Sequence, residues 1–364
     1  MSIVLTTFGL YFACFLFGRA QFRAFLPDDM SYMSHSRTNI INSLFIVFIF
    51  LRHIDQQALP FEGVDLIYRE CFDSCIGQFI VSSFFFFSGF GVMKSIEAKG
   101  NAYLNKLVTH RFVKLYFNAA FCILLVSVVV GCIRGKSLDS IIWDWLASLG
   151  LSDYWFIIMT LSIYIVTRMA FLMCSQYMKA IMITAVSIFF LCNVLYLVKP
   201  LWWLDTELCF PAGMILALYE CKFREKVRLI KLPIVIVGAA LVLIGVGFTF
   251  VMKLVYQILY SIHAIVSVPF HILTFPICCV VVLLGILLIF SSLDWKKEPA
   301  ALNWLGGNAV LWFYIMHFMP IYIVKYSGLE VSRMWAYVFI LVGSVWLAFV
   351  MQKAFAFTNK YFWK

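Results

Sequence analysis

The chain has 364 residues, of which 64% are apolar, 18% are aromatic and only 13% are charged, and its formal charge is +10. A soluble domain is about half apolar and a quarter charged, because charged residues must cover its surface, so this composition excludes a soluble protein. Apolar runs near twenty residues indicate an all-α fold, a polytopic transmembrane helical bundle, since barrel strands would alternate over about ten residues.

The first apolar segment, residues 3–18, is predicted to be a retained transmembrane helix. No basic residue precedes it, whereas Arg19 and Arg23 follow it, which is the reverse of the order in a secretory signal peptide. We therefore expect residues 1–36 to form an extra amino-terminal helix with a cytoplasmic linker. The main membrane domain is then expected over residues 37–364.

Ten further apolar segments are predicted to be helices, which makes eleven with the first. Two stretches are ambiguous. Residues 133–153 are apolar but short and acidic, and residues 253–272 fit either an interfacial helix or an additional span. The ten predicted segments are 39–54, 76–97, 115–132, 154–174, 180–198, 204–219, 232–252, 273–291, 308–325 and 335–352.

The distribution of basic residues sets the orientation of a membrane protein. With residue 39 on the cytoplasmic side, the predicted inner segments hold 18 Lys and Arg and the outer segments hold six. This bias places the carboxyl end in the cytoplasm and explains most of the positive charge, so we expect no nucleic-acid partner. The eleven cysteines include no C-x-x-C pair, and we expect no metal centre.

The first helix after the linker carries several polar side chains that a bilayer does not tolerate without a reason. Asn42 and His53 are eleven residues apart, which puts them near one face and about 16 Å apart along the axis. His53 lies near the predicted outer end beside Asp55, whose carboxylate is expected to orient the imidazole. Ser43 and Arg52 lie on the same helix. The alternative is an interfacial His and Arg that reach out to water.

Two stretches further along the chain have both a structural and a functional interpretation. Ser88 interrupts the aromatic run FFFFSGFG, where small residues permit close helix packing. Arg111 and Lys114 are three apart, so we expect them to share a helix face at the inner surface. Such a pair suits a ligand with several phosphates or lipid headgroups, although topology alone also supplies these charges.

Trp155 and His317 are the remaining candidates. Trp155 starts a predicted helix at the outer boundary and is typical of an aromatic belt. His317 falls near the middle of the predicted helix 308–325, where an unpaired imidazole is costly, so it needs a partner or a water-lined cavity. His263 and His271 lie in the ambiguous outer stretch and are not predicted to be ligands.

These segments, in this order, resemble the acyltransferase-3 family of bacterial integral membrane acyltransferases. The resemblance runs from about residue 37 to residue 352, with ten core helices as the family has, and leaves residues 3–18 outside it. The matching pieces are the polar helix ending in His53 and the stretches FFFFSGFG, HRFVKLYF, YWFIIMTLSIYI, CFPAGMILALYE and LGGNAVLWFYIMH.

The resemblance implies roles for several residues. In that family the His of the first core helix is the proposed catalytic residue, which is His53 here. A basic pair three residues apart, here Arg111 and Lys114, is thought to contact the acyl-CoA donor. The basic residue expected eleven positions before the His is Asn42 instead, and Arg37 is a nearby substitute. This departure leaves open a different donor or a loss of catalysis.

The activity that the resemblance implies is transfer of a short acyl group, most often acetyl, from cytoplasmic acyl-CoA (acetyl-CoA). The acceptor is a sugar hydroxyl of a cell-surface glycan or lipid-linked saccharide, and the location is the bacterial cytoplasmic membrane. His53 would be the general base, oriented by Asp55. Membrane lipid is the only further partner expected, and the oligomeric state is not predicted. The candidate oxyanion donors or substrate contacts are Asn42, Ser43, Ser88, Trp155 and His317.

Two non-catalytic alternatives stay open at this point. A carrier or exporter of a saccharide or small anion also requires polar residues inside its spans, and the Asn42 departure favours it slightly. A scaffold subunit of a glycan-assembly complex is the second alternative. Transfer of label from acetyl-CoA to a glycan, compared with transport without acylation, distinguishes the enzyme from the carrier.

Overall fold

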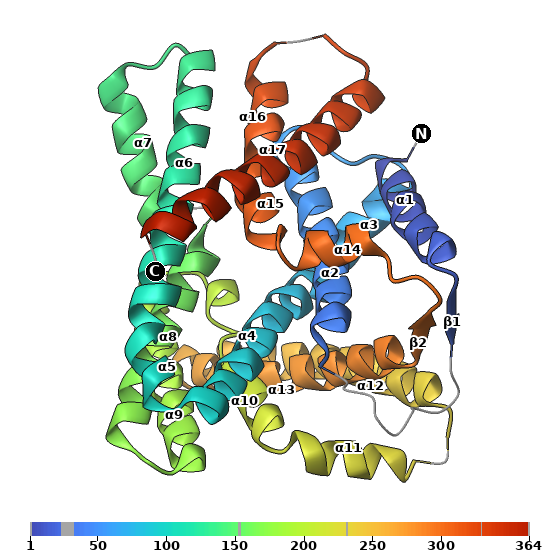
Figure 1. Ribbon diagram of the computed structural model, residues 1–364, viewed down its shortest axis with the longest axis vertical. Helices are drawn as coiled ribbons and strands as arrows, with labels where there is room; N and C mark the ends of the chain where they lie inside the picture. Colours follow the sequence, from blue (N-terminus) through green and yellow to red (C-terminus); the bar gives the residue numbers. More distant parts are fainter. Residues whose placement is uncertain (1, 23–32, 152–153, 231, 329, 363–364) are drawn as a thin grey trace.

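The computed structural model of the chain is a bundle of α-helices that pack at a wide range of angles (Figure 1). The all-α fold expected from the composition is thereby confirmed. The residues that the structure describes are 2–22, 33–151, 154–230, 232–328 and 330–362.

Eight helical segments of the described residues are long and apolar enough to cross a membrane. A ninth is possible if the helices after residue 300, which bend by 68° at a break, form one span. The eight are α2 (His35–Gln57), α3 to α4 (Asp65–Cys71, π-helical η1 Phe72–Ile76, Gly77–Lys99), α5 to α6 (Asn101–Lys106, π-helical η2 Leu107–Val113, Lys114–Ile133), α8 (Trp155–Met173), α9 (Tyr177–Leu195), α12 (Ile234–Ile262), α13 (Ala264–Ser291) and α17 (Arg333–Phe362). The bent segment comprises α14 (Ala300–Gly306), α15 (Val310–Met316) and α16 (Phe318–Tyr326).

All eleven predicted segments contain helix, but two of them hold only a single short helix, apart from the bent segment α15 to α16. The first, α1 (Ile3–Phe17), has 15 residues, and α10 (Cys209–Leu218) has ten. A span needs about 20 residues, because a helix rises about 1.5 Å per residue and the hydrocarbon core is about 30 Å thick. The structure therefore supports eight or nine spans rather than eleven. A helix packed between other helices, as α10 is, can be as apolar as one facing lipid.

The two ambiguous stretches are both helical. Residues 133–153 contain α7 (Leu138–Leu151), a 14-residue helix that packs beside α6 and is too short to span. Residues 253–272 are divided at His263 between the end of α12 and the start of α13, so they add no further span. These two helices run side by side (Figure 1).

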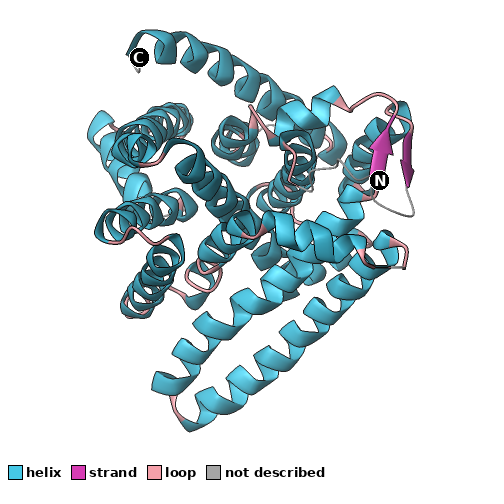
Figure 2. Cartoon of the chain, turned by 60° about the horizontal axis from the view of Figure 1, so that its bottom comes forward, coloured by secondary structure: helices cyan, strands magenta, loops and turns pink. Residues whose placement is uncertain are grey.

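The amino-terminal helix is tied to the rest of the bundle. After α1, the strand β1 (Ala20–Phe22) pairs antiparallel with β2 (Leu293–Trp295), and Figure 2 shows this short ribbon near the amino terminus. In α1 itself, the Tyr11 hydroxyl donates a hydrogen bond to the Ile40 carbonyl of α2 at 3.0 Å. The segment expected to lie outside the family core therefore packs directly against α2.

Glycines permit close helix contacts around the centre of the bundle. A Cβ at Gly89 of α4 would overlap the Phe210 carbonyl of α10, and one at Gly213 would overlap the Phe86 carbonyl. The FFFFSGFG stretch thus serves the close packing of α4 on α10. The remaining elements are the 3-10 turn η3 (Leu201–Trp203) between α9 and α10, and α11 (Glu220–Arg228) after α10.

Candidate active site

A cavity of about 730 Å³ lies between α2, α4, α8, α15 and the η3 turn. Most of its wall is aromatic or aliphatic, with a few polar groups, which is the usual make-up of a small-molecule site. The polar residues of the wall are Arg52, His53, Gln56, Asp73, Gln78 and Thr160, and the aromatic ones are Phe72, Phe84, Trp155, Phe156, Trp202, Trp203 and Tyr314.

His53 lies on the cavity wall and is paired with a second histidine behind it. Its Nδ1 is 2.7 Å from Nε2 of His317, and the two rings stack with centroids 5.0 Å apart and planes 8° apart. His317 is fully buried, and its Nδ1 is 2.8 Å from the Phe313 carbonyl oxygen. The partner that an imidazole inside the bundle requires is therefore His53.

This chain of contacts sets the tautomer of His53. A carbonyl oxygen only accepts hydrogen bonds, so Nδ1 of His317 carries a proton and donates a hydrogen bond to the Phe313 carbonyl. His317 lies among Phe50, Phe313 and Phe318, where a charge would be costly, so its ring is neutral and Nε2 is an acceptor. His53 must then donate from Nδ1, which leaves its Nε2 unprotonated and able to act as a base.

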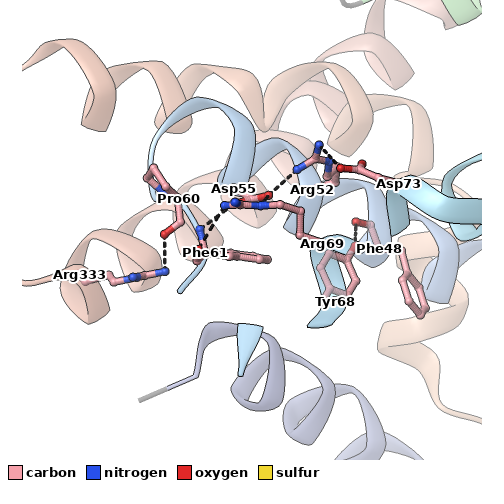
Figure 3. Close-up of polar contacts among 9 residues, drawn as sticks. All are labelled: Phe48, Arg52, Asp55, Pro60, Phe61, Tyr68, Arg69, Asp73 and Arg333. Atoms are coloured by element: carbon pink, nitrogen blue, oxygen red, sulfur yellow. Dashed lines mark hydrogen bonds and ion pairs between the residues drawn. The ribbon is translucent and has the colours of Figure 1, made fainter. Parts of the chain in front are cut away.

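An ionic network begins at the residue before His53. Arg52 donates to Asp55 and, at 2.8 Å, to Asp73, as Figure 3 shows. Asp55 also accepts from Arg69 Nε at 2.7 Å and from the backbone N–H of Phe61 at 2.7 Å. The network thus fastens α3, the loop before it and η1 to the end of α2, and Arg52 lies at the edge of the cavity.

The expected orientation of His53 by Asp55 is wrong. Asp55 is two residues after His53, and side chains two apart on a helix do not face each other. Both carboxylate oxygens bind the Arg52, Arg69 and Phe61 donors, whereas the imidazole contacts His317. Asp55 is a structural anchor in this geometry.

The structure also places Ser43 and His317 away from the cavity wall. Ser43 is fully buried, donates to the Ile40 carbonyl at 2.7 Å and lies 3.1 Å from the Tyr11 hydroxyl of α1. His317 has both ring nitrogens engaged. Neither residue reaches the cavity to bind an oxyanion, which corrects that prediction, because a helix side chain packed on a neighbouring helix cannot also face the central space.

Asn42 and Arg37, the candidates for donor binding on α2, are also outside the cavity lining. The Oδ1 atom of Asn42 is buried and has no hydrogen-bond partner among the described residues. Arg37 is in the first turn of α2, where its backbone N–H donates to Ser34 Oγ at 3.4 Å.

Ser88 and Trp155 have different positions. The Ser88 hydroxyl lies 2.8 Å from that of Tyr164, so it joins α4 to α8 and is not on the cavity wall. Trp155 does line the cavity, and its ring stacks on Trp203 with centroids 5.5 Å apart and planes 14° apart. The residue predicted as an aromatic belt residue is thus part of the site.

The expected cation pair lies where the fifth and sixth helices join. Arg111 belongs to η2, and its side chain lies outside what the structure describes. Lys114 is the first residue of α6, and its neighbour Leu115 lines the cavity. The chain segment that carries the basic pair therefore reaches the cavity wall.

Sequence reasoning missed Trp202, Trp203 and Gln78 as wall residues. Adjacent tryptophans in a predicted outer loop are ordinarily interpreted as interfacial anchors.

Behind the η3 turn, Asp205 and His271 form a buried contact of 3.3 Å. Burial raises the pKa of Asp205, and burial together with the neighbouring Asp205 charge raises the pKa of Glu207 well above its usual value.

The helices long and apolar enough to cross a bilayer define a multi-pass membrane protein. The cavity between them is lined by a neutral imidazole, which is suited to activating a hydroxyl. The described residues hold no group of three or more His, Cys, Asp or Glu side chains that could bind a metal. Comparison with known families adds a second, independent finding. The family model of the acyltransferase domain of the acyltransferase-3 type matches residues 34–353.

The chain belongs to this family and is an acyltransferase. The match begins one residue before the helix that carries His53 and ends inside α17, so it includes every described wall residue of the cavity. No curated protein and no solved structure matches the chain.

Proposed function

We propose that the protein transfers a short acyl group, acetyl in the simplest case, from acyl-CoA to a sugar hydroxyl. The acceptor is a cell-surface glycan or a lipid-linked saccharide. The observation that carries the proposal is His53: its tautomer leaves an unprotonated Nε2, and it lines a cavity large enough for an acyl thioester end and a sugar ring. Membership of an acyltransferase family supplies the reaction type.

In the proposed reaction, Nε2 of His53 removes the proton of the acceptor hydroxyl as its oxygen attacks the thioester carbonyl. The tetrahedral intermediate then collapses, the carbon–sulfur bond breaks and the ester forms. The CoA thiolate leaves and takes the proton back from the His53 imidazolium. His317 accepts the hydrogen bond from Nδ1–H of His53 throughout. This hydrogen bond stabilises the His53 imidazolium, and His317 itself takes no proton.

The donor in this proposal approaches along the side of α6. CoA is a polyanion, and Arg111 with Lys114 supplies positive charge in the segment whose next residue, Leu115, lines the cavity. The nucleotide would stay outside the cavity, at this basic segment. The distribution of basic residues supports the cytoplasmic membrane with this segment and the carboxyl end on the cytoplasmic side.

The test uses the full chain in membranes with labelled acetyl-CoA and a cell-envelope glycan extract. We expect acetyl incorporation to fall about 10²–10⁴-fold in His53→Ala, because the general base is removed. Ser88→Ala is the matched control, since that hydroxyl lies off the cavity wall. Wild-type incorporation by His53→Ala would overturn the base assignment, and saccharide transport without acylation would favour a carrier.

A further inference from the structure

Three tryptophans form one end of the cavity that contains His53. Trp202 lies edge-on to both neighbours, with centroids 5.7 Å from Trp155 and 5.7 Å from Trp203. The first comes from the start of α8 and the other two from η3. Residues almost fifty positions apart thus build one indole wall.

The three rings are not equivalent. Trp203 stacks on Trp155, and Lys199 Nζ lies 4.7 Å from the Trp203 ring centroid, so its faces are already in contact with protein groups. Trp202 is 50% exposed although it lines the cavity. The available aromatic surface is therefore that of Trp202.

Two polar atoms of the same wall lack protein partners. Gln78 donates from Nε2 to the Trp202 carbonyl at 3.0 Å, which fixes its amide, and its Oε1 is buried with no hydrogen-bond partner among the described residues. Nε1 of Trp203 is likewise buried and without one. Buried polar atoms are normally satisfied, so this acceptor and this donor, both on residues that line the cavity, call for a ligand that offers both functions.

The charged groups of the wall compensate each other. Arg52 bridges Asp55 and Asp73, and Arg69 also pairs with Asp55, so two arginines balance the two aspartates. Apart from Lys199, whose ammonium lies on the Trp203 ring and is not itself part of the lining, the arginine and aspartate charges of the wall are paired among the described residues. A hydroxyl group, which donates and accepts, matches the two open atoms, and the C–H face of a sugar ring matches an indole face.

We propose that Trp202, Trp203 and Gln78 form a subsite for an uncharged pyranose ring of the acceptor. The ring packs on Trp202, and its hydroxyls bind Nε1 of Trp203 and Oε1 of Gln78. This inference rests on the proposed acyl transfer to a sugar and specifies the acceptor as a neutral ring rather than an acidic sugar.

The test measures binding by calorimetry on the detergent-solubilised full chain, separately from catalysis. The probes are four neutral trisaccharides, of the gluco, manno, galacto and N-acetylglucosamine type. The two control compounds are mannitol, an acyclic polyol, and trigalacturonate, an acidic trisaccharide. We expect at least one neutral trisaccharide to bind and both control compounds to bind at least about tenfold more weakly.

Variants locate the binding. Trp202→Ala and Gln78→Leu are expected to weaken it about tenfold, and Trp203→Phe, which keeps an aromatic ring but removes the N–H, about fivefold. Trp143→Ala on α7, an exposed tryptophan that does not line the cavity, is the matched control and should bind as wild type. Thermal unfolding of each variant separates lost binding from lost folding.

The outcomes distinguish this inference from the proposed activity. His53→Ala should bind the trisaccharide and fail to acylate it. If the wild type also bound the trisaccharide without acylating it, the proposed activity would be overturned and the subsite would stand. The subsite is overturned if no neutral trisaccharide binds better than mannitol, if the acidic sugar binds best, or if Trp203→Phe and Gln78→Leu bind like wild type. Binding of phospholipid headgroups instead of sugars would also overturn it.

Discussion

His53 and Asp55, two residues apart at the end of α2, illustrate two uses of a polar group inside the bundle. Both carboxylate oxygens of Asp55 bind arginine or backbone donors, and its side chain is 1% exposed. His53 has one nitrogen bound by a neutral ring and its other nitrogen left for a ligand. Asp55 is buried and His53 is half-buried, and an open hydrogen-bonding position at a cavity is what marks the reactive one.

The sharpest way to break this comparison is to remove Asp55. Asp55→Ala should lower the free energy of unfolding by about 3–5 kcal/mol, because Arg52 and Arg69 lose their shared partner. Asp73→Ala removes a half-exposed partner of the same Arg52 and should cost less than about 1 kcal/mol. Denaturant unfolding of the detergent-solubilised protein measures both. Equal effects of the two variants would contradict the anchoring role.

His317 should act on the reaction through the His53 tautomer. His317→Phe keeps an aromatic ring but loses the acceptor, so we expect kcat to fall about 10–100-fold with donor KM unchanged. His317→Gln offers an amide oxygen to Nδ1 of His53 and should restore part of the rate. Steady-state kinetics over a pH series checks this. Similar rates for the two variants would leave His317 with a packing role only.

Glu207 extends the comparison to a fully buried carboxyl that lies beside a second one, Asp205. Its raised pKa means that the folded state holds the proton where the unfolded chain has lost it, so stability is full below the unfolded pKa of about 4.3 and declines as the pH rises. Glu207→Gln cannot ionise and should show a flatter decline in thermal stability between about pH 5 and pH 8. Parallel curves for the two proteins would contradict this.

The smallest effect is expected at Ser43. Ser43→Ala removes hydrogen bonds to Ile40 and Tyr11 and should cost about 0.5–1.5 kcal/mol, with no change in acyl transfer. Unfolding and the labelled acetyl-CoA assay test the two halves of the prediction. A loss of activity at unchanged stability would return Ser43 to the reaction site.

Much of the site was within reach of sequence reasoning, and its errors have definite causes. His53 and Trp155 were identified and both line the cavity, and the expectation that His317 needs a partner is confirmed. Asp55 was assigned by proximity in sequence, although a spacing of two residues turns it to another side of the helix. Trp203 was missed because an aromatic loop residue has the same appearance whether it faces lipid or a cavity.

The length of the spans was a second source of error. Hydropathy detected α10 as readily as α2, yet α10 has ten residues and α2 has 23. Apolar composition reports removal from water, and a helix enclosed by other helices satisfies that as well as one in lipid. The π-helical turns η1 and η2 were also beyond prediction, because residues 72–75 and 107–113 lie outside the predicted helices 76–97 and 115–132.

The sequence by itself determined the all-α membrane fold and the acyltransferase family, because hydropathy and ordered motifs are properties of residues read along the chain. Tertiary structure alone decided which polar groups meet. His53 and His317 are 264 residues apart, and Trp155 meets Trp203 only because the start of α8 lies beside the end of η3. Such contacts depend on how each helix is rotated and crossed against its neighbours, and local composition does not encode that geometry.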